Sequence, residues 1–169
     1  YSSFELISLF LGNAEIEIDG EITGELFSSA DTTFLNLDTK IDQMRYWDGL
    51  DLYFLYDFNF TLSMTNGSSL DSFDNFSADA TINAGRIFAG SEITNLAFNL
   101  NFVNNEAKID FNAVYDGSTA VDLDGLLVVN DHIVDVSLKK LKLSYKNFEL
   151  YNSDDIEFSY SDDKFIFRS

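Results

Sequence analysis

The sequence predicts an all-β protein, a long antiparallel meander curled into a concave, apolar-lined groove, with a short helix at its N-terminus. Three observations predict it. Residues Asp51 to Met64 alternate apolar and polar side chains, the period of a strand with one dry and one wet face. Similar alternation returns along most of the chain between short turns rich in Asn, Asp and Gly. The chain has no proline, so long backbone ladders are permitted throughout.

The composition limits the class of protein. A chain of 169 residues fits one domain, and 46% apolar residues with 17 Phe and 8 Tyr indicate a folded chain. The net charge of −19 would repel nucleic acid at long range, so we expect no nucleic-acid partner. Without cysteine there is neither a disulfide framework nor a thiolate metal site.

The first segment, residues 1–13, is expected to form a short amphipathic helix. Ser2 and Glu5 have the spacing of a capping box, the apolar residues that follow have helical spacing, and Gly12-Asn13 is a stop signal. The favoured role is a plug on the end of the sheet, and a membrane-surface helix is the alternative. Residues 14–169 are expected to be a single curved sheet domain.

Two strands are predicted before the long one. From Ala14 to Leu26 the apolar residues face one way and a row of carboxylates the other, which places the acidic face outside. Thr32 to Asp42 is the second strand. Residues Gln43 to Gly49, which include the single tryptophan, are predicted to be irregular.

The turn signals predict which residues of neighbouring strands lie opposite each other. A loop at Asn66-Gly67-Ser68 would place Phe58 opposite Phe76 and Leu52 opposite Ile82. A two-residue turn at Asn104-Asn105 predicts the pairs Phe102 with Ala107, Leu100 with Ile109, and Phe98 with Phe111. A turn at residues 116–118 then predicts the pairs Phe111 with Leu123 and Ala113 with Val121.

The C-terminal third continues the meander. The alternation slips at Lys139-Lys140, which predicts a bulge, and Lys146-Asn147 predicts a turn. A final pair of strands closes around residues 161–164. In total we expect ten to twelve strands joined mostly by short turns.

No constellation of residues indicates an enzyme. His132 is the only histidine and lies in an expected turn, and there is no phosphate loop, histidine-rich metal motif or nucleophile elbow. We therefore expect no catalytic residue, no cofactor and no metal. Four lysines gather in residues 139–146, and the simplest interpretation is a solvated strand face that offsets neighbouring acids, with a partner contact as the alternative.

The apolar face needs a cover, because a contiguous exposed apolar patch above a few hundred Å² marks a binding surface. Three architectures provide one: an extracellular adhesive or sugar-binding β-sandwich, an outer-membrane β-barrel, and a trough that holds acyl chains. The barrel is disfavoured by the length of the Asp51–Met64 strand. We favour the trough.

The run Ala14-Glu-Ile-Glu-Ile-Asp-Gly-Glu-Ile-Thr-Gly-Glu-Leu26, followed by repeated long alternating strands, resembles the β-rich repeats of TamB and other AsmA-like proteins. The resemblance implies a taco-like sheet in the periplasm of a double-membraned bacterium that carries lipid or assists insertion of outer-membrane barrels. The chain departs from that pattern in lacking proline and an inner-membrane anchor. Because it begins at Tyr1, we expect it to be a fragment of a longer, tethered protein.

The resulting hypothesis is a segment that bridges lipid or assists assembly, with acyl chains as ligand and an outer-membrane barrel as a further partner. The predicted groove-lining residues are Leu52, Phe54, Tyr56, Phe58, Phe60, Leu62, Leu96, Phe98, Leu100, Phe102, Ile109 and Phe111.

Overall fold

The protein is described by a computed structural model over residues 16–29, 32–47, 49–67, 76–130, 133–161 and 164–168. Regular structure in these ranges is β throughout. The predicted N-terminal helix and His132 lie outside the described residues. Within the described ranges, no helix has the length and apolar character needed to cross a membrane.

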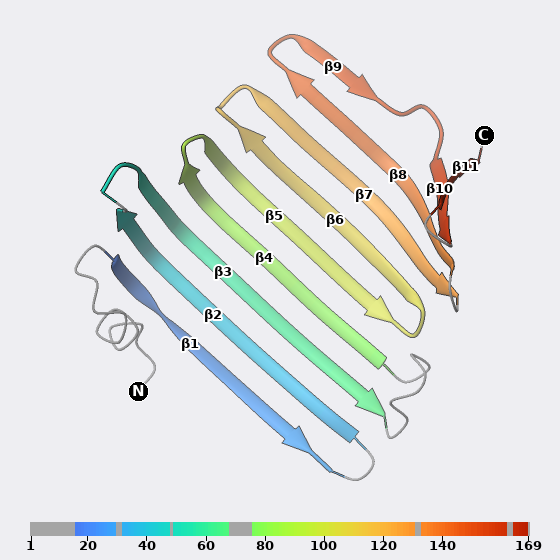
Figure 1. Cartoon of the computed structure of the whole chain (residues 1–169), viewed down its shortest axis with the longest axis horizontal. Helices are drawn as coiled ribbons and strands as arrows, with labels where there is room; N and C mark the ends of the chain where they lie inside the picture. Colours follow the sequence, from blue (N-terminus) through green and yellow to red (C-terminus); the bar gives the residue numbers. More distant parts are fainter. Residues whose placement is uncertain are drawn as a thin grey trace.

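The described chain forms one antiparallel sheet of eleven strands, within the range expected from the sequence (Figure 1). The strands are β1 (Ile16–Ser28), β2 (Thr32–Trp47), β3 (Leu52–Gly67), β4 (Phe76–Ala89), β5 (Glu92–Val103), β6 (Glu106–Tyr115), β7 (Thr119–Asn130), β8 (Ile133–Tyr145), β9 (Phe148–Tyr151), β10 (Ile156–Ser161) and β11 (Lys164–Arg168). Their order in the sheet follows the chain, except that β9 and β10 share one edge of β8.

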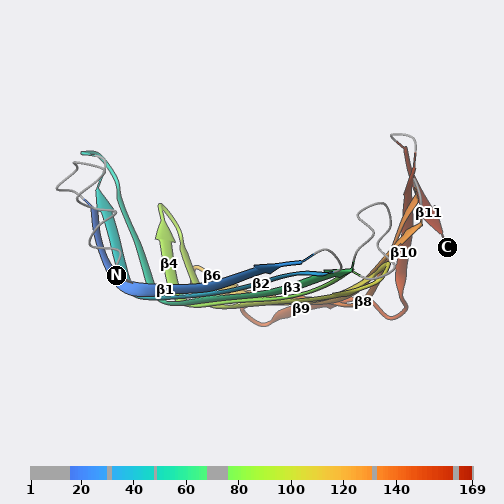
Figure 2. The ribbon, with the colours of Figure 1, turned by 90° about the horizontal axis from the view of Figure 1, so that it is seen from below.

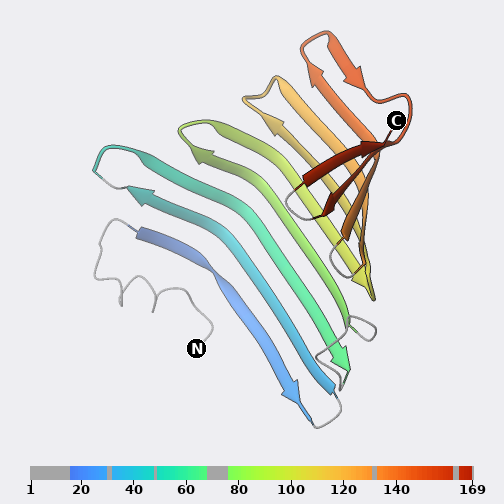
Figure 3. The ribbon, with the colours of Figure 1, turned by 45° about the vertical axis from the view of Figure 1, so that its right-hand side comes forward.

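The sheet is a single uncurled layer. Seen edge-on, the long strands lie side by side, and the ends of β2 and β3 near their connecting turn rise out of the layer (Figure 2). The C-terminal hairpin of β10 and β11, dark red, turns out of the plane at the opposite corner (Figure 3). Extensive contacts among the described strands join hydrogen-bonded neighbours. The described strands therefore do not form a sandwich, and the curling into a groove stays a prediction.

Several predicted registers are confirmed. Around the Asn104-Asn105 turn, Phe102 lies opposite Ala107 and Leu100 opposite Ile109. Around the next turn, Phe111 lies opposite Leu123. Asn104 and Asp116 have positive φ angles of 56° and 47°, which Asn and Asp tolerate better than most residues. Short turns with such residues fix the register of the strands they join. The predicted turn at residues 146–147 and the closing pair around 161–164 are likewise present.

Two predictions in the first half are wrong. The β3–β4 pairing begins at Asn66 and Phe76, so the connection is longer than the three-residue loop predicted. Phe58 consequently does not face Phe76, and Leu52 does not face Ile82, which instead lies opposite Phe60. The predicted irregular passage is also incorrect, because β2 continues to Trp47.

A row of extra residues crosses β2 to β5. The β1–β2 register shifts where Gly20 pairs with Ile41 and Asp19 with Gln43, so Asp42 has no counterpart in β1. The β5–β6 register shifts again at Asn95. The pairings from β2 to β5 keep one register, because each of these strands carries one extra residue in line. The four residues are Asp42, Asp57, Gly85 and Asn95.

The extra residues act as stacked β-bulges. Asp57 and Asn95 both have a φ of 53° in mid-strand, and bulges bend and twist a strand. A bulge residue also interrupts the alternation of side chains between the two faces. The prediction of a single phase from Asp51 to Met64 is therefore wrong. In β3, Leu55 shares a face with Phe58, whereas Phe54 and Tyr56 lie on the other.

The predicted bulge at Lys139-Lys140 is confirmed, since Asp124 pairs with Lys140 while Gly125 pairs with Leu138. Beside it, the strand that returns along β8 is broken into β9 and β10, and Asn152 fills the break. Its Oδ1 accepts a hydrogen bond from the Leu141 amide at 2.6 Å. Its Nδ2 donates to the carbonyl oxygens of Leu138, Lys139 and Asp154, at 3.3, 3.3 and 2.9 Å.

Replacing Asn152 by alanine is expected to lower the free energy of unfolding by about 1–3 kcal/mol, because the part-buried Leu141 amide loses its acceptor. Urea unfolding followed by circular dichroism measures the change. Asn147→Ala, at the exposed turn between β8 and β9, is the control and should cost less than about 0.5 kcal/mol. Equal effects of the two substitutions would contradict the assigned role of Asn152.

Candidate functional site

One face of the sheet, here called the apolar face, is built from apolar residues aligned across the strands. Beside the row of bulges, six of them lie opposite one another on successive strands from β1 to β6: Ile18, Met44, Leu55, Ile87, Ile93 and Tyr115. A second row runs from β3 to β8 through Phe60, Ile82, Phe98, Phe111, Leu123 and Leu141. Such cross-strand pairs are the unit that stabilises a sheet.

The apolar face is not sealed as a hydrophobic core. Among the described residues the buried apolar side chains are Ile41, Ala78, Ala84 and Ala107, and no described side chain is less than 2% exposed. The larger residues around them are half-buried, flanked by neighbours within the sheet and open above. The accessible surface is 11433 Å². A compact monomer of 19.1 kDa would expose about 8,400 Å².

The bulge row divides the twelve predicted groove residues between the two faces. Nine lie together on the apolar face: Phe58, Phe60, Leu62, Leu96, Phe98, Leu100, Phe102, Ile109 and Phe111. Leu52, Phe54 and Tyr56 lie on the opposite face, because they precede Asp57 in β3.

Sequence reasoning missed the residues that replace those three on the apolar face. On the apolar face of this part of β3 lie Tyr53 and Leu55, opposite Tyr46 and Met44 of β2. A signal for them was present, since Tyr53 and Leu55 are apolar residues at positions that a single phase would assign to the wet face. An aspartate in the middle of the strand marks the reversal.

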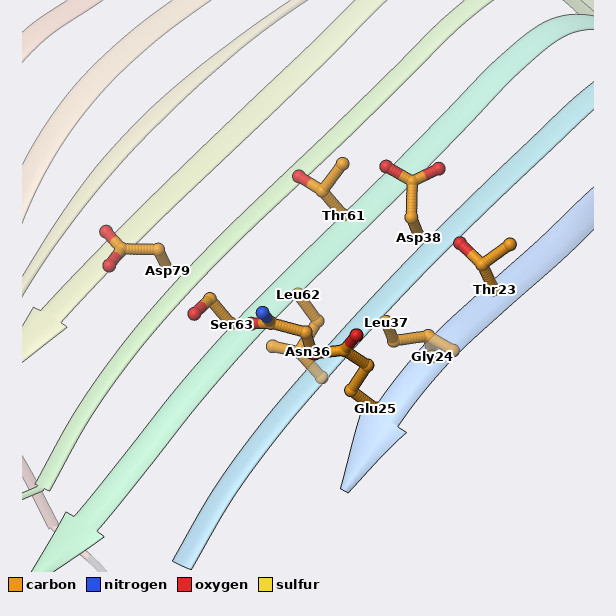
Figure 4. A pocket seen from close by; sticks show the side chains of 10 residues that line it. All are labelled: Thr23, Gly24, Glu25, Asn36, Leu37, Asp38, Thr61, Leu62, Ser63 and Asp79. Carbon is orange, nitrogen blue, oxygen red and sulfur yellow. The ribbon is translucent and has the colours of Figure 1, made fainter. Parts of the chain in front are cut away.

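The opposite face, here called the polar face, carries carboxylates, amides and hydroxyls along most of its length. A hollow of about 520 Å³ opens on it over β1 to β4, lined by side chains such as Glu25, Asn36, Asp38 and Asp79 (Figure 4). Asn101 donates a hydrogen bond to Asp79 at 2.6 Å. The hollow is open to solvent and acidic, so it has neither the enclosure nor the apolar lining of an acyl-chain site.

An aromatic cluster interrupts the polar face beyond the bulge row. The Phe54 and Phe88 rings stack with centroids 5.0 Å apart, and Tyr56 lies 5.4 Å from Phe54. The Arg86 guanidinium lies 4.8 Å from the centre of the Phe54 ring and is paired with Glu92. This cluster ties β3 to β4 and keeps Phe54 away from the apolar face.

The lysines of β8 are paired with carboxylates, in agreement with the favoured interpretation. Lys139 pairs with Asp155, Lys140 with Asp122, and Lys142 with Glu149 at 2.7 Å. The hydrogen bond from Lys142, and then its charge, lower the pKa of Glu149. Because the folded-state pKa is the lower one, this carboxylate contributes stability above its ordinary pKa, and the contribution is lost as the pH falls. At these exposed pairs the effect is small.

Within the described ranges, no group of three or more His, Cys, Asp or Glu side chains is arranged to hold a metal ion. Comparison of the chain with protein-family models, curated proteins and solved structures finds no match. The apolar face is therefore the feature of the molecule from which a function can be inferred.

Proposed function

We propose that this chain is an acyl-chain-binding segment of a longer protein, in which the apolar face shields lipid tails or nascent apolar strands from water. We place it in the periplasm of a double-membraned bacterium, tethered to the inner membrane and in contact with an outer-membrane barrel. No catalytic step or cofactor is part of this proposal.

The observation that carries the proposal is the unsealed apolar face. Its rows run across six or more strands, and the described strands supply no second layer to cover it. From a strand spacing of about 4.8 Å and a rise of about 3.3 Å per residue, eight strands of about twelve residues each span an area on the order of 1,500 Å². An exposed patch well above a few hundred Å² is typical of a binding surface.

The chemistry of the face suits an acyl chain. Each buried CH₂ contributes about 0.8 kcal/mol, and this interaction has no preferred direction. A lipid tail that moves from one row of apolar residues to the next would exchange similar contacts at each step. The small residues Ala84 and Ala107 are buried, so their larger apolar neighbours form the surface that a methylene chain would contact.

Charge substitution on the apolar face is expected to abolish lipid binding. In Phe98→Asp, a carboxylate replaces a ring that lies between Ile82 and Phe111 in its row, and a bound tail would desolvate that charge. Phe58→Asp should act in the same way. Binding is measured by native mass spectrometry of lipid retained after detergent-free purification, and by titration with a fluorescent fatty acid.

Phe54→Asp is the matched control. It makes the same chemical change in a half-buried aromatic residue four positions from Phe58 in the same strand, but on the polar face. We expect it to retain lipid binding. Circular dichroism and urea unfolding establish that each variant is folded. Retention of lipid by folded Phe58→Asp and Phe98→Asp, or equal loss in Phe54→Asp, would contradict the proposal.

A further inference from the structure

The two edges of the sheet differ in how they are protected. At the C-terminal side the edge is formed by short strands, β9 of four residues and β11 of five. At the other side, β1 is thirteen residues long, and no described strand pairs with its outer edge. Natural proteins usually protect edge strands by making them short, by placing Lys or Pro in them, or by bulging them. β1 has no Lys or Pro, and the extra residue beside it belongs to β2. Its charged residues are all carboxylates, which would repel an acidic strand but not a basic one.

The charge on β1 has one sign. Four carboxylates, those of Glu17, Asp19, Glu21 and Glu25, lie along its polar face, and all four residues are exposed. Glu17 approaches Arg45 at 4.0 Å, and the nearby Lys40 is paired with Asp42 at 2.9 Å. In the described part of the chain, no ion pair within 4.0 Å involves the other three carboxylates. Lys40 lies opposite Glu21 and interacts electrostatically with Glu21 and Asp19, and its own ion pair is with Asp42. A neighbouring strand with basic residues on this face would therefore meet carboxylates whose charge Lys40 and Arg45 offset only in part.

The other side of β1 is apolar and incomplete. Ile22 is 41% exposed and Leu26 is 73% exposed, so the apolar face continues to the outermost strand. Gly20 and Gly24 share this side and contribute no side chain, so they interrupt the row of apolar side chains on either side of Ile22. Bulky side chains on an adjacent strand can fill the space next to edge glycines.

We propose that β1 binds an additional β-strand, supplied by a partner polypeptide in which Lys or Arg alternates with bulky aliphatic or aromatic residues. Backbone hydrogen bonds along the outer edge of β1, with which no described strand pairs, supply affinity. Alternating side chains supply specificity, because basic residues pair with the β1 carboxylates and bulky residues extend the apolar face. This inference is independent of lipid binding, since it uses the edge of the sheet.

The test uses a fluorescently labelled twelve-residue peptide in which Lys alternates with Val, and a matched peptide with Glu in place of Lys. Fluorescence anisotropy measures affinity, and hydrogen exchange locates the bound peptide. We expect the Lys peptide to bind and to protect β1 amides, and the Glu peptide to bind at least about tenfold more weakly.

Charge reversal at the edge distinguishes strand addition from general attraction to an acidic protein. In Glu21→Lys/Glu25→Lys, the preference should invert, so that the Glu peptide binds more tightly. The control, Glu106→Lys/Asp110→Lys, makes the same charge change on the polar face of β6 and should leave the preference unchanged. If the lysine variant fails to fold, Glu21→Gln/Glu25→Gln removes the two charges without reversing them and should reduce the preference for the Lys peptide. Equal responses to the edge and β6 substitutions, or binding without protection of β1, would overturn the proposal. Lipid retention should be unaffected by the edge substitutions, because they lie on the polar face of β1.

Discussion

Replacing Gly20 by alanine is expected to detach β1 from the sheet. A Cβ atom at this position would overlap the Lys40 carbonyl oxygen and lie 2.8 Å from the Ile41 Cα. Both are backbone atoms of β2, drawn close to β1 by the extra residue at Asp42, so neither can move without displacing the strand. Crowding of this kind costs about 1–3 kcal/mol or more. Because β1 is an edge strand, the damage should remain local.

Hydrogen exchange measures this effect strand by strand. Amides of β1 and the facing amides of β2 should lose protection in Gly20→Ala, while those of β4 to β7 keep it. Gly24→Ala is the matched control in the same strand and on the same side. Its Cβ would lie 3.2 Å from the Asn36 carbonyl oxygen and 3.4 Å from Leu37 Cδ1, contacts that require only a small adjustment. Unchanged protection of β1 in Gly20→Ala would show that the β1–β2 contact is looser than described.

The same substitution separates the two functional proposals. Loss of β1 should remove binding of the basic peptide, because its backbone partner is gone. Lipid binding should persist, because Phe58, Phe98 and the residues aligned with them lie on other strands. A simultaneous loss of both activities would indicate that the sheet unfolds as a whole when its edge is disturbed.

The sequence was sufficient to predict the strands wherever a turn signal and a simple alternation agreed. The hairpin at Asn104-Asn105 is the clearest case, because a two-residue turn permits one register and both faces of the pair are consistent with it. The β3–β4 hairpin failed for the complementary reason. Several turn-forming residues follow Met64, and several registers pair large residues with small ones equally well.

The alternation at even positions hid the bulge row, and apolar Tyr53 and Leu55 at odd positions were the one sign of it in β3. In β3, the residues before and after Asp57 are apolar at even positions in both cases, so the sequence reads as one uninterrupted phase. The extra residue in β3 is accommodated because β2, β4 and β5 carry one in line with it, and that relation depends on pairings distant in sequence. Three of the twelve predicted groove residues were assigned to the wrong face for this reason.

Valine at the two mid-strand positions of positive φ is expected to destabilise the bulge row. Asp57 and Asn95 adopt a φ of 53°, a left-handed conformation that costs most L-residues roughly 1–2 kcal/mol and that Asn and Asp adopt more readily. A β-branched side chain is especially unfavourable there. Asp57→Val has an additional constraint, since Gly85 lies so close that a Cβ built on it would be 3.1 Å from the Asp57 Cβ. Each valine should lower the free energy of unfolding by about 1–2 kcal/mol.

Glycine at the same two positions is the informative control, because it accepts positive φ without strain. Asp57→Gly and Asn95→Gly should therefore stay within about 1 kcal/mol of the parent in urea unfolding. Thr61→Val, on the polar face of β3 in regular strand geometry, should be tolerated as well. The two valine effects should add, because β4 separates the positions by about 10 Å. If valine and glycine proved equivalent at both positions, the left-handed backbone would not be what holds the row, and the division of the aromatic residues between two faces would need another cause.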